Sequence, residues 1–410
     1  MNNERTISQS IYNFQSALIQ DGNTLESYLK TVYSNKWISD STHHVLAIRT
    51  TFVNSMHNYL HNKGLYNMER VSLSPVTDPL AHDIEHVPTI SYKGHDYRGT
   101  HSMIYPKFLA CFNKKIKGIY VDSPNIRLEL ESSDGAQRGK YLIDFSQMDI
   151  ELKRNRNISI EEYLNNVENV KKVLNEDMEE AMSFFEELLV TSVREIKNRN
   201  EDDLKALGVD LEEPKIPFPR FKKDELIKKY GNKDIERKCG KEAGTQFFWI
   251  VGLIRENYDL IYPYLNKDGS KINLNDVTSD MVYNYDICAQ ALQRDTNTFG
   301  DAYEISSGAI REWLFEPIVE RLVDNKIINT RPEIKNGNIE NVDELDGYGP
   351  FLMATSLKDE DGKQMFPDTF GGGIGIERTL FALCKGDVIK KIDDITLFGK
   401  NPDSHPIYLF

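Results

Sequence analysis

The feature that most constrains the fold of this chain is a glycine run near its C-terminal end, Phe370-Gly-Gly-Gly-Ile-Gly-Ile-Glu-Arg378-Thr379. Glycine carries no Cβ, so such a run lets the backbone come close to a ligand or to another segment. The apolar stretch 380–384 follows directly and predicts a buried helix, which places the run where a strand turns into a helix. Backbone amides at a helix start attract anions, and Arg378 adds a planar guanidinium. A tightly packed junction without a ligand is the alternative interpretation.

The spacing of these glycines excludes two common nucleotide-binding motifs. Gly371, Gly373 and Gly375 alternate, and Ile376 stands where a dinucleotide-binding fingerprint needs its third glycine. A P-loop is excluded because no Gly-Lys-Ser/Thr follows.

A second segment, residues 141–152, is predicted to be a strand with one polar face. Side chains on a strand alternate between its faces, so Gln147, Asp149 and Glu151 are expected to project together, opposite Met148 and Ile150. Three neighbouring polar side chains suit the floor of a pocket, and a solvated sheet edge is the alternative. Upstream, residues 127–129 place an arginine and a glutamate two positions apart.

A third segment combines two carboxylates with an arginine. Asp286 begins it, and Glu304-Ile-Ser306-Ser307-Gly-Ala-Ile-Arg311 ends it. Two carboxylates can hold magnesium on a polyphosphate, and an arginine can clamp a substrate carboxylate.

Together the three segments resemble the catalytic core of a class II aminoacyl-tRNA synthetase. The nearest likeness is to the ammonia-dependent, A-type asparagine synthetases, which are tRNA-independent relatives of the aspartyl and asparaginyl enzymes. Six segments carry the resemblance in order: 73–78, which ends in Asp78; 101–107, with the same serine-to-lysine spacing; 145–151, the core of motif 2; 240–252; 304–311; and 371–378, which is motif 3. Val71 stands near the place of the usual motif 1 proline.

The resemblance implies an α+β fold, in which an antiparallel sheet is flanked by helices and carries helical insertions. We expect an N-terminal helical extension over 1–44 and a catalytic domain over 45–410 with a helical insertion at about 160–220. It implies a homodimer, with the helix 44–63 at the interface.

The resemblance also assigns roles to single residues. Catalytic roles fall to Arg127, Arg378 and Lys107. Substrate contacts are implied for Asp78, Ser102, Lys107, Gln147, Asp149, Ser306, Ser307 and Arg311. ATP contacts are implied for Arg127, Glu129, Arg138, Glu304, Gly373, Gly375 and Arg378. Magnesium ligands would be Asp286 and Glu304.

The chemistry expected of such a site begins with an unreactive carboxylate. Transfer to AMP gives its oxygen a good leaving group, and this needs magnesium and cationic groups at the polyphosphate. Arg127 and Arg378 fit the cationic role. Arg311 and Lys107 would clamp the unreacting carboxylate of aspartate, and Asp78 and Asp149 would accept its ammonium.

The nitrogen donor is expected to be free ammonia or another small amine. A glutamine-dependent synthetase needs an exposed N-terminal cysteine, whereas position 2 is Asn2 and the first cysteine is Cys111. Two alternatives stay open: ligation of aspartate or a related acid to a larger amine in a specialised pathway, and a non-catalytic synthetase-like regulator. A tRNA-charging enzyme is less expected, because no basic anticodon-binding barrel is evident.

Composition agrees with a cytoplasmic enzyme that acts on small molecules. The net charge of −14 disfavours a general nucleic-acid surface, and no apolar run is long enough to span a membrane. Four scattered cysteines suit reduced thiols.

Periodicity predicts the remaining elements. Helices are expected over 7–35, 44–63, 159–198 and 222–239, a buried strand over 245–254, and a polar connector over 197–219. The charged segment 165–200 is interpreted as mainly a solvated helical face. The metalloprotease-like pattern at 82–86 is interpreted as a loop, because Pro79 and Pro88 bracket it.

Overall fold

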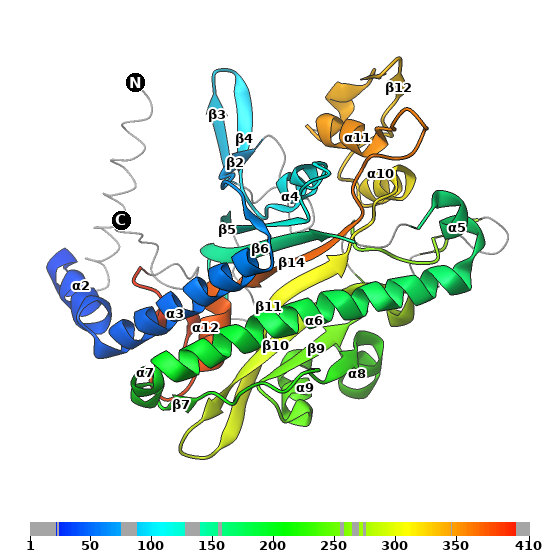
Figure 1. The fold of residues 1–410 in the computed structure, drawn as a ribbon. Coiled ribbons are helices and arrows are strands. Elements are labelled where there is room, and N and C mark those ends of the chain that lie inside the picture. The colour runs from blue at the N-terminus through cyan, green and yellow to red at the C-terminus, as the bar shows by residue number, and fades with distance from the viewer. Residues whose placement is uncertain are drawn as a thin grey trace.

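A mixed α+β architecture is seen in the computed structural model, which describes residues 22, 24–74, 88–127, 140–154, 158–254, 258–264, 270–273, 276–345 and 347–398. A large, mainly antiparallel sheet runs through its centre, with helices on both sides (Figure 1). The expected fold class is confirmed.

The central sheet has the strand order β1-β5-β6-β14-β11-β10-β9-β8, and β7 also pairs with β10. All pairs are antiparallel except β1 with β5 and β8 with β9, which are parallel. The strands are β1 Tyr66–Asn67, β5 Gly118–Ile126, β6 Asp144–Lys153, β7 Val209–Asp210, β8 Arg220–Lys222, β9 Phe247–Val251, β10 Asn284–Gln293, β11 Thr298–Ile310 and β14 Thr369–Gly375.

Two small sheets lie outside the central one. One has the order β2-β4-β3, and the other pairs β12 with β13. Their bounds are β2 Leu73–Ser74, β3 Thr89–Tyr92, β4 His95–Gly99, β12 Ile334–Lys335 and β13 Asn338–Ile339.

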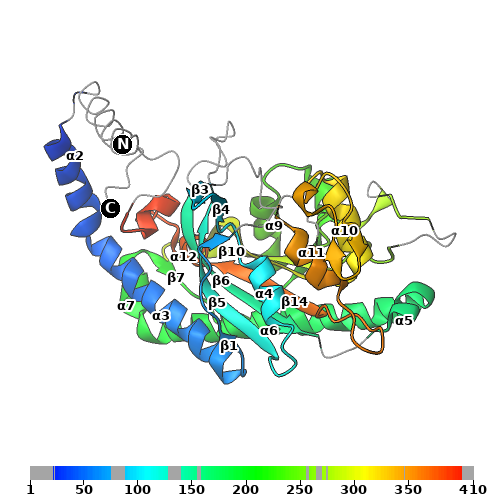
Figure 2. The ribbon, with the colours of Figure 1, turned by 90° about the horizontal axis from the view of Figure 1, so that it is seen from above.

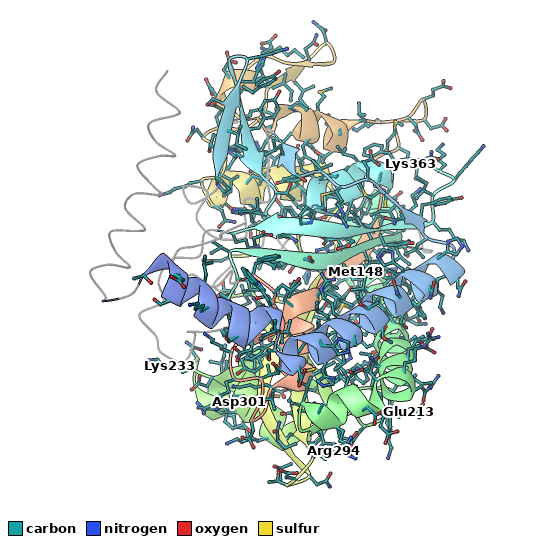
Figure 3. All side chains as sticks on the ribbon, turned by 90° about the vertical axis from the view of Figure 1, so that its left-hand side faces the viewer. Met148, Glu213, Lys233, Arg294, Asp301 and Lys363 are labelled. Carbon is teal, nitrogen blue, oxygen red and sulfur yellow. The ribbon has the colours of Figure 1, made fainter. Side chains whose placement is uncertain are left out.

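Three helices cover one face of the central sheet. These are α3 (Asp40–Asn62), α6 (Val167–Arg199) and α12 (Ile376–Cys384), and α3 and α6 run side by side (Figures 1 and 2). Their apolar stripes meet sheet residues such as Met148 in the main core. Figure 3 places Met148 within the body of the molecule, whereas Lys233 and Arg294 lie toward its outline.

Helices on the opposite face are shorter. α8 (Lys223–Tyr230) and α9 (Ile235–Ala243) form a second core with Phe248, Ile250 and Cys288. α4 (Ile104–Ala110) meets α11 (Gly349–Ser356) through Tyr105 and Phe351, whose ring centroids are 4.1 Å apart. The remaining α-helices are α2 Leu25–Val32, α5 Ile160–Asn165, α7 Glu201–Ala206 and α10 Phe315–Asp324.

The predicted helix 44–63 and strands 141–152 and 245–254 are confirmed, although α3 begins four residues earlier. Other boundaries need correction. The helix expected over 159–198 is interrupted at Asn166, the one over 222–239 is two helices, and the connector 197–219 contains α7 and β7. The helix expected over 7–35 lies mostly outside the described residues, as does the loop 82–86.

Two helices each bury an apolar stripe. α6 has a solvated face, as interpreted, and a buried face on which Phe185, Leu188 and Val193 are fully buried. The apolar stripe of α3 is buried within one chain, since Ile48, Phe52 and Met56 are at most 1% exposed, so this stripe does not itself form a dimer interface. No described helix is long and apolar enough to cross a membrane.

Candidate active site

The polar residues of β6 face the glycines of β14. Gln147 pairs with Gly375, Asp149 with Gly373 and Glu151 with Gly371. A Cβ added to Gly371 would overlap the Glu151 carboxylate, and one added to Gly373 would overlap the Gln147 amide. These two glycines therefore make room for side chains of the neighbouring strand, which lie over them as the floor of a site.

The intervening residues point the other way. Met148 and Ile150 on β6, with Ile374 on β14, belong to the core beneath α3 and α6. The predicted alternation of β6 is confirmed, and it separates an apolar face from a polar one.

A buried cluster of charges occupies one end of the polar face. The Lys107 Nζ lies 2.9 Å from Asp149 Oδ1 and 3.7 Å from Glu151 Oε2. The Arg311 Nε lies 3.3 Å from Glu151 Oε1, and its Nη1 lies 3.6 Å from Asp259 Oδ1. All five residues are at most 4% exposed, so the ion pairs are only weakly screened by solvent.

The Arg311 guanidinium is held in its charged form. Burial alone would lower the pKa of this group, but the carboxylates of Glu151 and Asp259 outweigh burial and raise the pKa above its usual range. Glu151 is fixed in turn by Thr369, whose hydroxyl donates to Oε1 at 2.7 Å. A rigid, charged guanidinium suits the recognition of a carboxylate.

Acceptor atoms of two β6 side chains have no hydrogen-bond partner within the described residues. They are Asp149 Oδ2, next to Lys107, and Gln147 Oε1, on the same face of β6 two residues earlier. An unsatisfied buried acceptor costs about 1–3 kcal/mol. Buried acceptors that remain unpaired at this cost suggest a ligand with hydrogen-bond donors, such as an ammonium group.

The other end of the polar face carries two arginines with aromatic partners. Arg378, in the first turn of α12, lies 3.6 Å from Glu304 and 5.3 Å from the centre of the Tyr141 ring. Arg127 donates to the His101 carbonyl and lies 5.2 Å from the centre of the Phe145 ring. The predicted strand–helix junction is confirmed, because β14 ends at Gly375 and α12 begins at Ile376.

The two carboxylates expected to hold magnesium lie on the polar face. Asp286 pairs with Ser307 across β10 and β11, and Cys288 pairs with Glu304, so Asp286 and Glu304 are close along one face. Their hard oxygen donors suit magnesium, which takes one or two protein carboxylates and completes its shell with phosphate and water. Within the described ranges, no three His, Cys, Asp or Glu side chains form a metal-binding group.

The structure does not bring Ser306 to this site. Ser306 pairs with Ile287 and Ile374, which face the helices, whereas Ser307 pairs with Asp286 and Gly373. The pairing then shifts, because Cys288 pairs with Glu304 and Ile305 of β11 is passed over. This extra residue in β11 is why Glu304 returns to the polar face. Ser306 is 2% exposed on the core side, so the substrate contact predicted for it is corrected.

The remaining predicted residues divide into two groups. Ser102 accepts from the Ile104 amide at 3.3 Å at the start of α4, which carries Lys107 into the charge cluster. Gly375 could take a Cβ without overlap, since its nearest neighbours would lie in ordinary van der Waals contact, 3.7 Å away. Asp78, Glu129 and Arg138 lie outside the described residues.

Sequence reasoning missed three residues of the site. Asp259 lies in a stretch that carried no motif. Thr369 directly precedes the glycine run. Glu377 accepts from the Ser146 amide at 2.8 Å and so fastens α12 to β6; its place beside Arg378 was the only signal.

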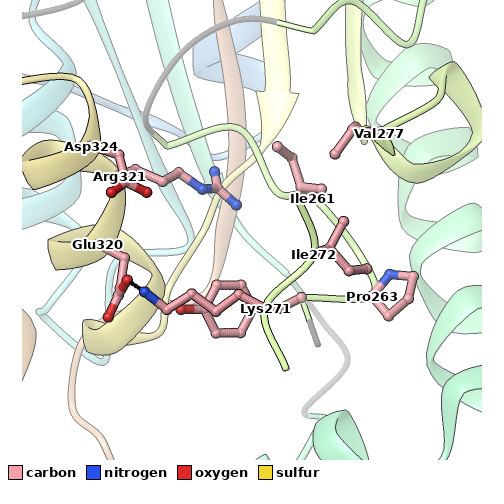
Figure 4. A pocket seen from close by; sticks show the side chains of 9 residues that line it. Ile261, Pro263, Lys271, Ile272, Val277, Glu320, Arg321 and Asp324 are labelled. Carbon is pink, nitrogen blue, oxygen red and sulfur yellow. Dashed lines mark ion pairs between the residues drawn. The ribbon is translucent and has the colours of Figure 1, made fainter. Parts of the chain in front are cut away.

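A separate hollow lies beside the charge cluster, between α10 and residues 261–264, 271–272 and 277 (Figure 4). Lys271 is ion-paired with Glu320 on its wall. Arg321, also on the wall, donates to the Asp259 carbonyl and so connects the hollow with the charge cluster.

Comparison with known proteins gives relatives of one kind. The chain is 29% identical over 153 residues to the Aspartate--tRNA(Asp) ligase of Thermococcus kodakarensis, which covers 36% of this chain and 32% of that one. It is 24% identical over 208 residues to the Aspartate--tRNA(Asp/Asn) ligase of Methanococcus aeolicus, covering 50% and 40%. The chain thus spans about a third to two fifths of the length of these relatives.

Among solved structures, asparaginyl-tRNA synthetase from Pyrococcus horikoshii complexed with asparaginyl-adenylate is similar, with a TM-score of 0.61 and 17% identity over 89% of this chain and 70% of that one. A likeness at this identity concerns the fold. The model of the family described as tRNA synthetases class II (D, K and N) matches residues 25–402. With this match over most of its length, the chain belongs to the class II tRNA synthetase family of the D, K and N type.

Proposed function

We propose that this chain is an AMP-forming ligase that activates the side-chain carboxylate of aspartate with ATP and passes the acyl group to ammonia. The family is one of ATP-dependent ligases. The observation that carries the substrate is the buried cluster of Lys107, Asp149, Glu151 and Arg311, which offers both a carboxylate clamp and an ammonium acceptor. Residence in the cytoplasm belongs to the same proposal.

The first half-reaction would join aspartate to the α-phosphorus of ATP. The side-chain carboxylate oxygen attacks phosphorus, the bond to the bridging oxygen breaks, and pyrophosphate leaves with its electron pair. Arg127 and Arg378 would stabilise the charge at phosphorus. Magnesium, when bound by Asp286 and Glu304, would neutralise the polyphosphate.

In the second half-reaction ammonia attacks the acyl carbon, AMP leaves, and the attacking nitrogen loses a proton. Asp149 Oδ2 and Gln147 Oε1 would hold the α-ammonium of aspartate, while Arg311 would hold its α-carboxylate. These contacts would keep the acyl carbon in place while AMP leaves and ammonia attacks.

A second acceptor is supported by the names of the relatives. They are tRNA ligases, and transfer of the activated acyl group to tRNA would use the same first half-reaction. A larger amine remains a third acceptor, in place of ammonia.

The test is a pyrophosphate-exchange screen with ATP, magnesium and each amino acid, followed by mass spectrometry after addition of ammonia, other amines or tRNA. Aspartate-dependent exchange, AMP and asparagine are expected. Exchange with another acid would replace the substrate, and an acyl-tRNA product would replace the acceptor. No exchange with any acid would support the non-catalytic alternative.

The homodimer also remains a proposal, although the α3 stripe no longer supports it. Sedimentation at micromolar concentration should give a species near twice 47.2 kDa. A single 47.2 kDa species would contradict it.

A further inference from the structure

Asp259 is placed directly against the Arg311 guanidinium by the backbone. Residues 259 and 311 form an antiparallel bridge between two segments. On either side of this bridge, the Leu260 amide donates to the Ile310 carbonyl at 2.9 Å, and the Glu312 amide donates to the Tyr258 carbonyl at 2.7 Å. The Asp259 carbonyl also accepts from Arg321, so the position of this residue is fixed before its side chain makes any contact.

The side chain of Asp259 is oriented by Asn284. The Asn284 Oδ1 accepts from the Leu253 amide at 2.8 Å, which identifies its other terminal atom as the nitrogen. That Nδ2 donates to Asp259 Oδ2 at 2.6 Å. Because Asn284 can only donate here, Asp259 must accept, and its second oxygen, Oδ1, is turned toward Arg311 Nη1 at 3.6 Å.

The guanidinium is thereby held on two sides. Glu151 takes the edge formed by Nε and Nη2, at 3.3 and 3.5 Å, and Asp259 lies beside Nη1. A guanidinium carries five N–H donors in a rigid plane. Glu151 accepts one hydrogen bond each from Nε and Nη2, and Nη1 is held by the ion pair with Asp259. Among the described residues, this leaves N–H groups at the end formed by Nη1 and Nη2 for a carboxylate ligand.

We propose that Asp259, oriented by Asn284, is a positioning residue that fixes the plane of Arg311 for recognition of the substrate's unreacting carboxylate. This inference rests on the proposed function, because it assigns Arg311 to that carboxylate. It adds a determinant of acid recognition that lies outside every motif of the chain.

Asp259→Asn tests the role with little change of shape. The amide oxygen can still accept from Asn284, but the group turned to Arg311 becomes an NH2, which cannot accept. The KM for the acid should rise about ten- to a hundredfold, since the buried ion pair that orients Arg311 loses one of its charges. The KM for ATP and kcat should change less than about threefold. ATP binding and acyl transfer depend on the other end of the polar face, where Arg127 and Arg378 lie. Asp259→Glu, which retains the charge, should recover part of the loss.

Asp177→Asn is the matched control. Asp177 is 1% exposed and paired with Arg154, so it is equally buried but belongs to α6 on the helix side. It should lower the thermal unfolding midpoint and leave the KM for the acid unchanged. Asn284→Ala is a second variant, which leaves the Asp259 charge in place and should raise the KM for the acid by a smaller factor.

Three results would be decisive. An unchanged KM for the acid in Asp259→Asn, with an active wild-type chain, would overturn the role of Asp259 alone. A fall in activity that merely follows the folded fraction, as in Asp177→Asn, would do the same. A wild-type chain that exchanges pyrophosphate with no acid would overturn the proposed function and this inference with it.

Discussion

The two faces of the central sheet are built by alternate residues of the same strands, and they use glycine for different reasons. On the polar face, Gly371 and Gly373 make room for Glu151 and Gln147 of the next strand. On the helix face, Gly372 makes room for the ring of Phe185, which lies 3.1 Å from where a Cβ would be. One run of glycines thus serves a site and a core at once, and a motif of this kind does not by itself tell which face carries the chemistry.

Charge distinguishes the two faces better than glycine does. The polar face buries Lys107, Asp149, Glu151 and Arg311 and leaves acceptors without hydrogen-bond partners among the described residues. The helix face buries apolar side chains that pack against α6 and α3. The comparison predicts that substitutions on the helix face change stability, whereas those on the polar face change catalysis.

Phe185→Ala should show the largest effect. Phe185 is fully buried, and its ring lies 5.8 Å from that of Tyr285, so truncation should cost about 3–5 kcal/mol of unfolding free energy. Denaturant unfolding measures this loss. Turnover per folded molecule should stay near the wild-type value. A large loss of turnover in fully folded protein would break the division between the faces.

Arg378→Ala should give the next largest effect, in catalysis. Loss of one preorganised charged contact typically costs about 3–4 kcal/mol, or roughly a hundred- to a thousandfold in rate. The unfolding midpoint should barely move, because the side chain is 28% exposed and its ion pair with Glu304 is partly solvated. Pyrophosphate exchange measures the rate. Turnover near that of the wild type would mean that the glycine run serves packing only.

Gly373→Ala and Gly375→Ala form a matched pair on one strand. The new methyl at 373 would overlap Gln147, whereas the one at 375 would have no neighbour closer than 3.7 Å. Overpacking of this kind costs about 1–3 kcal/mol of stability. Because the displaced group is the Gln147 amide, which we propose holds the substrate's ammonium, we also expect a roughly tenfold or greater rise in the KM for the acid at 373. At 375, stability should be nearly unchanged, and any loss of activity there would report a ligand that comes close to the backbone. Equal effects of both variants on the KM for the acid would contradict the role given to Gln147.

The sequence allowed the central features of this site to be predicted, because they follow from local periodicity. The alternation of β6 and the strand–helix junction at Gly375 need only a few neighbouring residues to be recognised. Ser306 was misplaced because the register shift in the β10–β11 pair lies between two segments, and one extra residue turns every following side chain to the other face. Asp259 was missed because its role arises from a β-bridge to Arg311, which is 52 positions away in the sequence.

The smallest effect is expected in the pH dependence of stability, from a buried charged group on the helix face of the sheet. Arg154 joins Asp177 of α6 to Asp368, which directly precedes β14. Burial raises the pKa of Asp368 from 3.8 to about 7, and Arg154 opposes this only in part. A carboxyl with a raised pKa keeps its proton longer in the folded state, so stability falls as pH rises from about 4 to 7 and then levels off. Between pH 6 and pH 8 this group should remove about 1 kcal/mol of stability. Denaturant unfolding of the wild type and of Asp368→Asn at both pH values measures the difference, and an identical pH dependence in the two proteins would show that Asp368 stays ionised beside Arg154.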